Sequence, residues 1–428
     1  MISLILFCFG ALIGTVVNWA IYQLCYFRVR SISPFSTPDE QASRRQFVDY
    51  LPIVGWLRMK SDSAIHGRGF WIRPMLIEVT LGCFAVWFYQ WQIHGGLIGG
   101  GTLAAGQGEL WYAAHMLLVV LLTIATFIDF DEQTIPDAIT IPGTIAGLLF
   151  AVFFPAFHLP QTVNSLQGGA FEPMTFVSPA SLDRETVMWI DDWRGLALGV
   201  GVLMLWAFAL MPKICTMRYG LLKGIQYMVA SMSRPRRKSE AQVGSAPRRP
   251  FGYVWMLLGL GILLSIGYTF VWFRNGPIYI SLLHSVLGLA MGGGIVWAVR
   301  ILAGAAYGQE AMGFGDVTLM AMIGTFVGWQ PSLLIFGIAP CAAVGIALVQ
   351  FIVSKNRALA FGPYLAAGTI ILILFWDQLW NDWARKRLFA DTQLILGVVG
   401  VSLVVFAITM FGMRLLRGPA DFDDASTE

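Results

Sequence analysis

Long uninterrupted apolar runs constrain this chain more than any other feature. The first run, residues 2–24, contains no charged residue, and similar runs recur along the sequence. About 20 apolar residues are enough for a helix to cross a bilayer, and a helix pairs every backbone group within its own segment in lipid. Only 12% of the 428 residues are charged, against roughly 25% in soluble globular domains. We therefore expect an all-α fold, a polytopic transmembrane helical bundle.

The apolar pattern predicts about 10–11 spans. The first run has no basic residue before it and no small-residue cleavage site, so we expect a retained span. A shorter helical pattern over residues 316–329 is expected to form the first half of a tight hairpin. The other candidate spans are residues 2–24, 75–92, 112–129, 138–156, 195–212, 253–273, 280–302, 331–353, 359–376 and 391–413.

Basic residues are concentrated in two connecting segments. Residues 27–74 hold eight Lys and Arg residues and residues 212–252 hold nine, whereas residues 94–111 hold none. Since cytoplasmic loops are enriched in Lys and Arg, we expect the N-terminus outside and both basic segments in the cytoplasm. Three basic residues at 385–387 fall on the outer side in this count. Either the topology shifts there, or an interfacial helix from Trp376 to Trp383 tolerates them.

The chain is expected to comprise six parts and to lie in the cell inner membrane. A net charge of +3 is too small to indicate nucleic-acid binding, and membrane lipid is the expected surrounding. The predicted parts are a first span (1–26), a cytoplasmic loop domain (27–74), spans with the first aspartate motif (75–156), an external loop (157–192), spans with a basic linker at 213–250 (193–302), and spans with the second aspartate motif and a C-terminal tail (303–428).

Two acidic motifs interrupt the apolar pattern where spans meet the cytoplasm. Asp129 ends one span, and Asp316 begins a helix directly after Gly313-Phe314-Gly315. These glycines permit φ values closed to other residues and a close approach to a neighbour, and Asp316 is expected as a helix N-cap. An ionisable residue in a span costs about 2.5–3.5 kcal/mol on insertion scales and is a functional candidate by default. Taken singly, each acid also fits a capping or interfacial role.

The predicted topology puts both acids on the same side of the membrane. If their helices pack closely, like-charge repulsion keeps one proton shared between the two carboxyls. The ionised carboxyl can then take a proton from water while the protonated one polarises a peptide carbonyl. This is aspartic-protease chemistry, and it requires no metal.

The two motifs resemble those of prepilin peptidases, membrane aspartic proteases that cut leader peptides from type IV prepilins and related pseudopilins. The family pattern is an aspartate followed eight positions later by Pro-Asp, and then Gly-x-Gly-Asp; Pro136-Asp137 and Gly313–Asp316 supply these. Residues 14–22, 49–57 and 361–368 also resemble family segments. The resemblance implies that Asp129 and Asp316 are catalytic and that Asp131 is not. It implies accessory positions at Asp137, Gly313, Gly315 and Thr318.

The sequence also departs from the family pattern. Thr318 stands where a lysine is common, and the first cytoplasmic loop lacks the four cysteines of many members, so that loop is expected to fold without zinc. The resemblance implies prepilin or pseudopilin partners and no cofactor for proteolysis. Bifunctional members also methylate the new N-terminus, and S-adenosylmethionine is expected only if that activity is retained. Substrate-binding residues and oligomeric state are not indicated.

Two other classes of function remain open. A transporter or channel also carries acids within its spans, although the two motifs differ in form and no internal repeat is evident. An inactive relative that only binds pilin-like partners is the second alternative. Arg73 and Glu78 are interpreted as interfacial anchors rather than substrate contacts. The five histidines share no i,i+4 spacing, which argues against a histidine metal site; they are His66, His94, His115, His158 and His284.

Overall fold

The structure is a computed structural model whose chain divides into two compact units, Met1–Val187 with Gly276–Glu428, and Met188–Asn275. Each unit is described by itself below. The structure describes residues 1–25, 32–35, 41–100, 103–163, 170–176, 190, 192–211, 251–307, 312–354, 361–389, 397 and 400.

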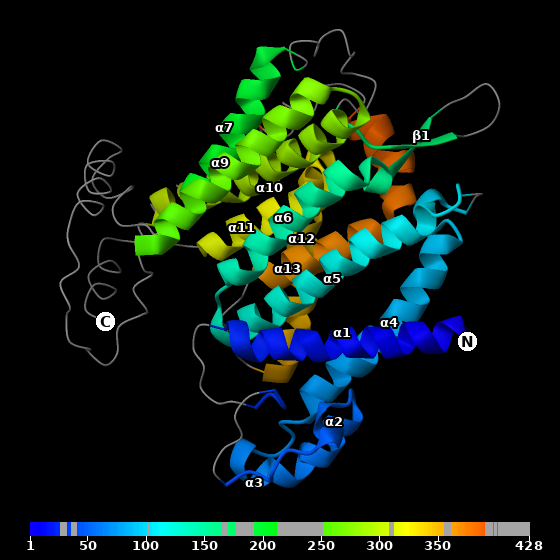
Figure 1. The fold of residues 1–428 in the computed structure, drawn as a ribbon, viewed down its shortest axis with the longest axis vertical. Coiled ribbons are helices and arrows are strands. Elements are labelled where there is room, and N and C mark those ends of the chain that lie inside the picture. Colours follow the sequence, from blue (N-terminus) through cyan, green and yellow to red (C-terminus); the bar gives the residue numbers. More distant parts are fainter. Residues whose placement is uncertain are drawn as a thin grey trace. The chain divides into compact units, whose positions relative to one another are not determined.

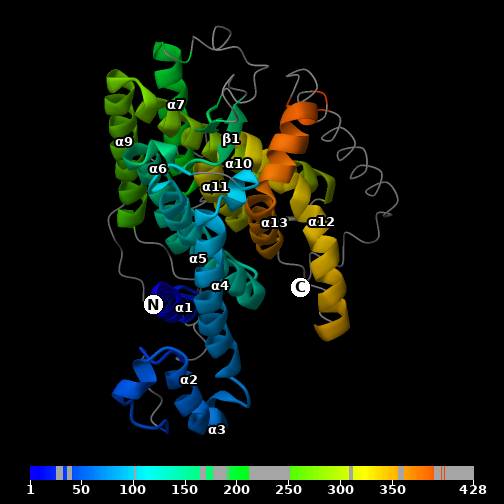
Figure 2. The same cartoon turned by 90° about the vertical axis from the view of Figure 1, so that its right-hand side faces the viewer.

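The larger unit is built almost entirely of helices. The axes of its helices α5, α6 and α10 are inclined alike in Figure 1, and the short helices α2 and α3 lie beyond one end of α4 (Figures 1 and 2). Its elements are α1 (Ile2–Leu24), η1 (Phe47–Tyr50), α2 (Val54–Met59), η2 (Lys60–Asp62), α3 (Ser63–His66), α4 (Ile72–Ile93), η3 (Gly96–Ile98), α5 (Gln107–Glu132), α6 (Asp137–Phe153), η4 (Pro155–Phe157), β1 (Pro160–Val163), β2 (Ala170–Pro173), α10 (Pro277–Tyr307), α11 (Phe314–Val327), α12 (Trp329–Ser354), α13 (Gly362–Leu374) and the π-helix η6 (Asp377–Leu388).

Helix α11 is the most enclosed element of this unit. Each of its residues from Asp316 to Val327 is buried, as expected for a helix that is apolar on all sides. Gly288 of α10 meets the Gly324 backbone of α11, and Gly147 of α6 meets Thr325, with no room for a Cβ at either glycine. Small residues allow this close helix packing in membranes. The Gly-x-Gly-Asp motif therefore leads into the centre of the bundle.

Helices α1 and α4 also pack through small residues. A Cβ added at Gly10 would lie 2.7 Å from the Cβ of Ala85, and one at Gly14 would lie 2.6 Å from the Cα of Glu78. Beside this contact the Glu78 carboxylate is buried and accepts hydrogen bonds from Thr15 Oγ1 and Asn18 Nδ2, at 3.1 Å each. The first two predicted spans are thus joined through a buried acid.

A layer of short elements covers one end of the larger unit. Strands β1 and β2 pair antiparallel, with Pro160 opposite Pro173. Helix η6 bends by 91° from α13, and its Asn381 Oδ1 accepts hydrogen bonds from the backbone N–H and hydroxyl of Thr162. The Arg385 guanidinium donates to the Thr162 carbonyl. A helix at this sharp angle to the preceding span fits the interfacial alternative for the basic residues at 385–387.

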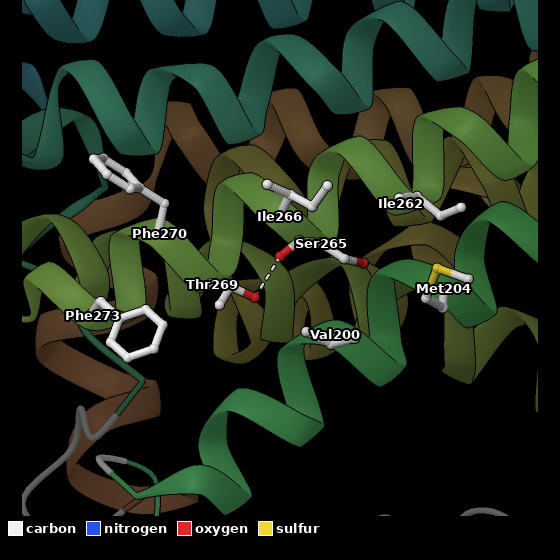
Figure 3. A pocket seen from close by; sticks show the side chains of 8 residues that line it. All are labelled: Val200, Met204, Ile262, Ser265, Ile266, Thr269, Phe270 and Phe273. Carbon is white, nitrogen blue, oxygen red and sulfur yellow. Dashed lines mark hydrogen bonds between the residues drawn. The ribbon is translucent and has the colours of Figure 1, made fainter.

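The smaller unit contains α7 (Trp193–Ala209) and α9 (Phe251–Arg274). They pack where Gly199 of α7 meets the Tyr268 ring of α9, and the Tyr268 hydroxyl donates to the Gly195 carbonyl at 3.1 Å. An open groove of about 550 Å³ runs between the helices, with Val200 and Met204 on one side (Figure 3). The hydroxyls of Ser265 and Thr269 in this groove donate to carbonyls of their own helix, so the groove presents an apolar surface.

The predicted all-α membrane bundle is confirmed. Among the described residues five helices are long and apolar enough to cross a membrane, or up to six if α13 and η6 form one broken span. Four shorter apolar helices occupy predicted segments, namely α6, α7, α11 and the first part of α12 (Trp329–Ala343). The predicted span at 391–413 lies outside the described residues except for Gly397 and Gly400, and the basic linker at 213–250 lies wholly outside them.

Candidate active site

Asp129 lies in the last turn of α5 and is 4% exposed. Its carboxylate Oδ2 accepts a hydrogen bond of 3.1 Å from the backbone N–H of Gly362, at the start of α13. The helix ends directly afterwards, because Gln133 takes a left-handed conformation (φ 53°) and its N–H bonds back to the Asp129 carbonyl. The side chain is therefore held at the end of a span and faces another helix.

Asp316 lies in the first turn of α11 and is 7% exposed. The backbone N–H of Gly313 donates to its carboxylate. Asp316 is the third residue of the helix, and an acidic side chain at that position commonly accepts a bond from the N-cap N–H. Two expectations are corrected here. The N-cap is Gly313 rather than Asp316, and Gly313 has φ −65°, so neither glycine of the motif needs a positive φ.

The glycines of the motif are instead required for close approach. A Cβ at Gly315 would lie 2.9 Å from the Cβ of Ile135, in the segment that joins α5 to α6. A Cβ at Gly362 would lie 2.7 Å from the Asp129 carboxylate and 2.8 Å from Ile135. Three segments that are far apart in sequence thus meet at Ile135, which closely follows the last turn of α5 that carries Asp129.

The remaining accessory positions are Thr318 and Asp137. Thr318 is buried, and its hydroxyl donates to the Gly315 carbonyl at 2.9 Å, within its own helix. Asp137 is the first residue of α6, after Pro136 at the N-cap, and it is half-buried. The structure therefore places Thr318 beside the glycine motif and Asp137 at the far end of the segment that follows Asp129.

Arg300 of α10 is a neighbour of Asp316 that the sequence reasoning missed. Its side chain is buried, its Nε donates to the Met312 carbonyl at 2.8 Å, and its guanidinium lies 5.8 Å from the centre of the Phe314 ring. Its charge also acts on Asp316. One indication of this was present in the sequence, because Arg300 is the single Lys or Arg in the predicted span 280–302. An ionisable residue within a span is a functional candidate, as are the two aspartates.

Other polar candidates have structural partners. Asp131 is exposed and forms a two-pronged ion pair with Arg73 of α4, with both N–O distances at 2.8 Å. The buried Glu78 carboxylate accepts further hydrogen bonds from the Ile53 N–H and Trp56 Nε1 of the loop before α4. Arg73 and Glu78 therefore link α4 to its neighbours. The interpretation of Glu78 as an interfacial anchor is wrong, because its carboxylate is buried between α4, α1 and the loop.

Two of the histidines contact one another away from this site. The rings of His158 and His284 are 4.7 Å apart, and His158 Nε2 lies 2.9 Å from the Ser281 hydroxyl. Within the described ranges, no group of three His, Cys, Asp or Glu side chains is placed to hold a metal ion. The candidate site is the pair of buried aspartates described above.

The fold and site define a multi-pass membrane protein in which two buried aspartates from distant motifs meet at the ends of helices. A model of the type IV leader peptidase family matches residues 116–178 and 251–348, and these stretches contain both motifs. The resemblance to prepilin peptidases is confirmed, and this chain is their relative.

Individual relatives match over part of their length. The chain is 34% identical over 128 residues to a prepilin leader peptidase/N-methyltransferase of Pseudomonas putida, covering 29% of this chain and 42% of that protein. It is 32% identical over 117 residues to the protein of that name from Escherichia coli K12 (27% of this chain, 48% of that one) and 35% identical over 109 residues to that from Aeromonas hydrophila (24% and 36%). The matches thus span less than half of each relative. No solved structure matches the chain.

Proposed function

We propose that this protein is an aspartic endopeptidase that removes the leader peptide from type IV prepilins or pseudopilins. Asp129 and Asp316 are its catalytic pair. The observation that carries this proposal is that two buried carboxyls, contributed by motifs 187 residues apart, lie where α5, α11 and α13 approach one another around Ile135. The family match over both motifs supports it.

In the proposed reaction the two carboxyls share one proton. The ionised carboxylate takes a proton from a water molecule as the water oxygen attacks the scissile carbonyl carbon. The protonated carboxyl gives its proton to the carbonyl oxygen, which yields a neutral tetrahedral diol. As the C–N bond breaks, one carboxyl protonates the leaving nitrogen and the other takes a proton from a diol hydroxyl. This leaves a carboxylic acid and an amine, and the pair again holds one proton. The N–H groups of Gly362 and Gly313 orient the two carboxyls throughout.

The proposed site faces the cytoplasm at the inner membrane. Asp129 ends a span and Asp316 begins a helix, so a peptide bond at the membrane boundary reaches both. An apolar helical substrate held in the bilayer would present its leader junction at this level. The basic segment 27–74, which joins α1 to α4, supports the cytoplasmic assignment by its charge.

The test is cleavage of a prepilin by purified protein in liposomes, followed by N-terminal sequencing of the product. Asp129→Asn and Asp316→Asn are each expected to lose about 10²–10⁴-fold in rate, the range for a general acid or base. Asp131→Asn is the matched control, because it removes the same charge two residues from Asp129. Full activity in either variant of the pair would overturn the assignment. An inactive wild type that still binds prepilin indicates a binding relative, and ion flux through the liposomes indicates a transporter.

Methylation is a separate question for this chain. The curated relatives are named as both peptidases and N-methyltransferases, and S-adenosylmethionine would be needed only for the second activity. Incubation of an already cleaved pilin with labelled S-adenosylmethionine and Asp129→Asn protein measures it without proteolysis. Transfer of label to the N-terminus would establish methylation, and its absence would leave proteolysis as the single activity proposed.

A further inference from the structure

The segment Phe47–Leu57, between α1 and α4, has an inverted arrangement of polar and apolar side chains. Its acid, Asp49, is 3% exposed, whereas Phe47 is 79% exposed and Val54 and Leu57 are each 49% exposed. A water-soluble loop normally buries the apolar side chains and exposes the charge. The exposed apolar residues are Phe47, Val48, Tyr50, Leu51, Val54 and Leu57.

The buried acid Asp49 has both a hydrogen-bond donor and an ion-pair partner, and these contacts stabilise the inverted arrangement. Asp49 accepts a hydrogen bond of 2.7 Å from the Gln46 N–H and pairs with Arg58. The packing is tight at Gly55, where an added Cβ would meet the Asp49 backbone. Because the partners of Asp49 are the two residues that flank the segment, the outer face of the segment consists largely of apolar side chains.

The contacts of this segment fix its depth relative to the spans. The Ile53 N–H and Trp56 Nε1 donate to Glu78, which lies six residues inside α4. Glu78 also contacts Asn18 and Thr15, six and nine residues before the end of α1. At 1.5 Å per residue these positions lie about 9–14 Å inside the helix ends. Since α1 is about 34 Å long and the hydrocarbon core about 30 Å thick, the segment reaches the hydrocarbon boundary.

Two neighbouring surfaces favour lipid as the occupant of the exposed face. On α1, Leu12, Val16 and Trp19 are exposed, and in a membrane span such residues face acyl chains. Beyond the segment, the exposed side chains of Lys60 and Arg68 follow, and basic residues at this level attract anionic headgroups. An apolar face bordered by cations is the pattern of an interfacial element that lies in one leaflet.

We propose that Phe47–Leu57 is inserted in the leaflet at the C-terminal end of α1, with its apolar face in contact with lipid. The segment acts as an interfacial anchor for the loop region between the two spans. This inference does not depend on the proposed peptidase activity, because it concerns the depth of a segment away from both aspartates.

The experiment measures lipid contact at single labelled positions. Cysteine replaces Val54 or Leu57 in a background where the five native cysteines are changed to serine, and an environment-sensitive fluorophore is attached. The protein is placed in nanodiscs of phosphatidylethanolamine and phosphatidylglycerol with or without brominated acyl chains. Val16→Cys on α1 is the lipid-facing control, and Ala64→Cys, on the exposed surface of α3, is the water-facing control.

Val54→Cys and Leu57→Cys are expected to lose emission with brominated lipid to the extent seen for Val16→Cys, while Ala64→Cys keeps its emission. Emission at Val54 and Leu57 that matches Ala64→Cys would overturn the proposal. If the emission at these positions changed on addition of a prepilin peptide but was not quenched by brominated lipid, the proposal would be overturned in favour of a substrate-binding surface. The unmodified protein gives a second measurement: a photoactivatable acyl-chain lipid should label residues 47–57 and leave residues 60–68 unlabelled.

Discussion

The loop region between α1 and α4 and the candidate active site each bury two aspartates, but they satisfy these acids in different ways. In the loop region both are paired with arginines: Asp49 with Arg58, and Asp62 with Arg45 at 3.1 Å. Asp62 also accepts hydrogen bonds from the hydroxyl and N–H of Ser43. The two ion pairs therefore lie within the loop region between α1 and α4.

The two aspartates of the candidate site are buried to a similar degree, yet their hydrogen bonds come from backbone N–H groups. Asp129 is bound by Gly362 and Asp316 by Gly313, and the Arg300 Nε near Asp316 donates to a backbone carbonyl. Burial alone therefore does not separate a structural acid from a chemical one. The difference lies in the direct ion pairs: Asp49 and Asp62 each form one with an arginine, whereas the described residues show none for Asp129 or Asp316. This difference predicts opposite consequences for substitution.

The largest expected effect is a separation of activity from stability. Asp129→Asn should lose about 10²–10⁴-fold in prepilin cleavage with no loss of thermal stability, since Asn keeps an oxygen that can accept the Gly362 N–H bond and no arginine pair is broken. Asp62→Asn should unfold at lower temperature and keep its rate of cleavage per folded molecule. Cleavage by liposome-reconstituted protein and thermal unfolding in detergent micelles measure the two. A destabilised Asp129→Asn protein would place that acid among the structural ones.

The second effect is the loss of one partner from a buried ion pair. Arg45→Met leaves Asp62 buried without its cation, which costs about 3–5 kcal/mol in comparable pairs. Denaturant titration of the purified protein measures this change in unfolding free energy. Arg44→Met is the control, because the neighbouring side chain is exposed. Equal stability of the two variants would show that Arg45 contributes little to the loop region.

The third effect tests Arg300 and rests on the proposed peptidase activity. Arg300→Met removes the hydrogen bond to the Met312 carbonyl, and bonds from charged groups contribute about 1.5–3 kcal/mol. We expect a roughly 10–100-fold lower cleavage rate if that energy positions Asp316. Arg300→Lys, which keeps the charge, should recover part of the rate. Unchanged cleavage in Arg300→Met would remove Arg300 from the site.

The sequence was sufficient to predict the helical bundle and the meeting of the two aspartate motifs. Each depends on local information: apolar runs of span length, and acids placed at span ends on one side of the membrane. The close approach around Gly315 was also predicted, because glycine is what permits it. The N-cap position of Asp316 was wrong by one turn, since the helix begins at Phe314.

Partners contributed by other helices could not be predicted in this way. The Gly362 N–H reaches Asp129 from 233 positions further along the chain, and nothing in either local pattern specifies that contact. Glu78 and Arg300 could have been identified from the sequence as candidate functional residues, because each is an ionisable residue in a predicted span. Their partners still required the fold, since Glu78 binds side chains of α1 and Arg300 binds the turn before α11.

The fourth effect is a dependence of stability on pH that originates in the loop region. Burial raises the pKa of Asp62, but hydrogen bonds from Ser43 and the charge of Arg45 outweigh it and hold the pKa below its ordinary value of 3.8. Asp62 therefore stabilises the fold above pH 4, and this contribution is lost as the pH falls through the lowered pKa. Thermal unfolding from pH 7 to pH 3 should show wild type and Asp62→Asn converging at the acid end. A constant difference between them would contradict this assignment.

The smallest effect concerns Asp131, an acid that is neither buried nor chemical in this comparison. Its pair with Arg73 leaves both side chains more than a third exposed, at 44% and 37%, and exposed pairs contribute about 0.2–1 kcal/mol. Asp131→Asn should therefore lower stability by less than about 1 kcal/mol and leave cleavage unchanged. Arg73→Gln should cost more, because the guanidinium also lies 4.8 Å from the Phe127 ring. If Asp131→Asn abolished cleavage at unchanged stability, pairing with an arginine would no longer distinguish the structural acids from the catalytic ones.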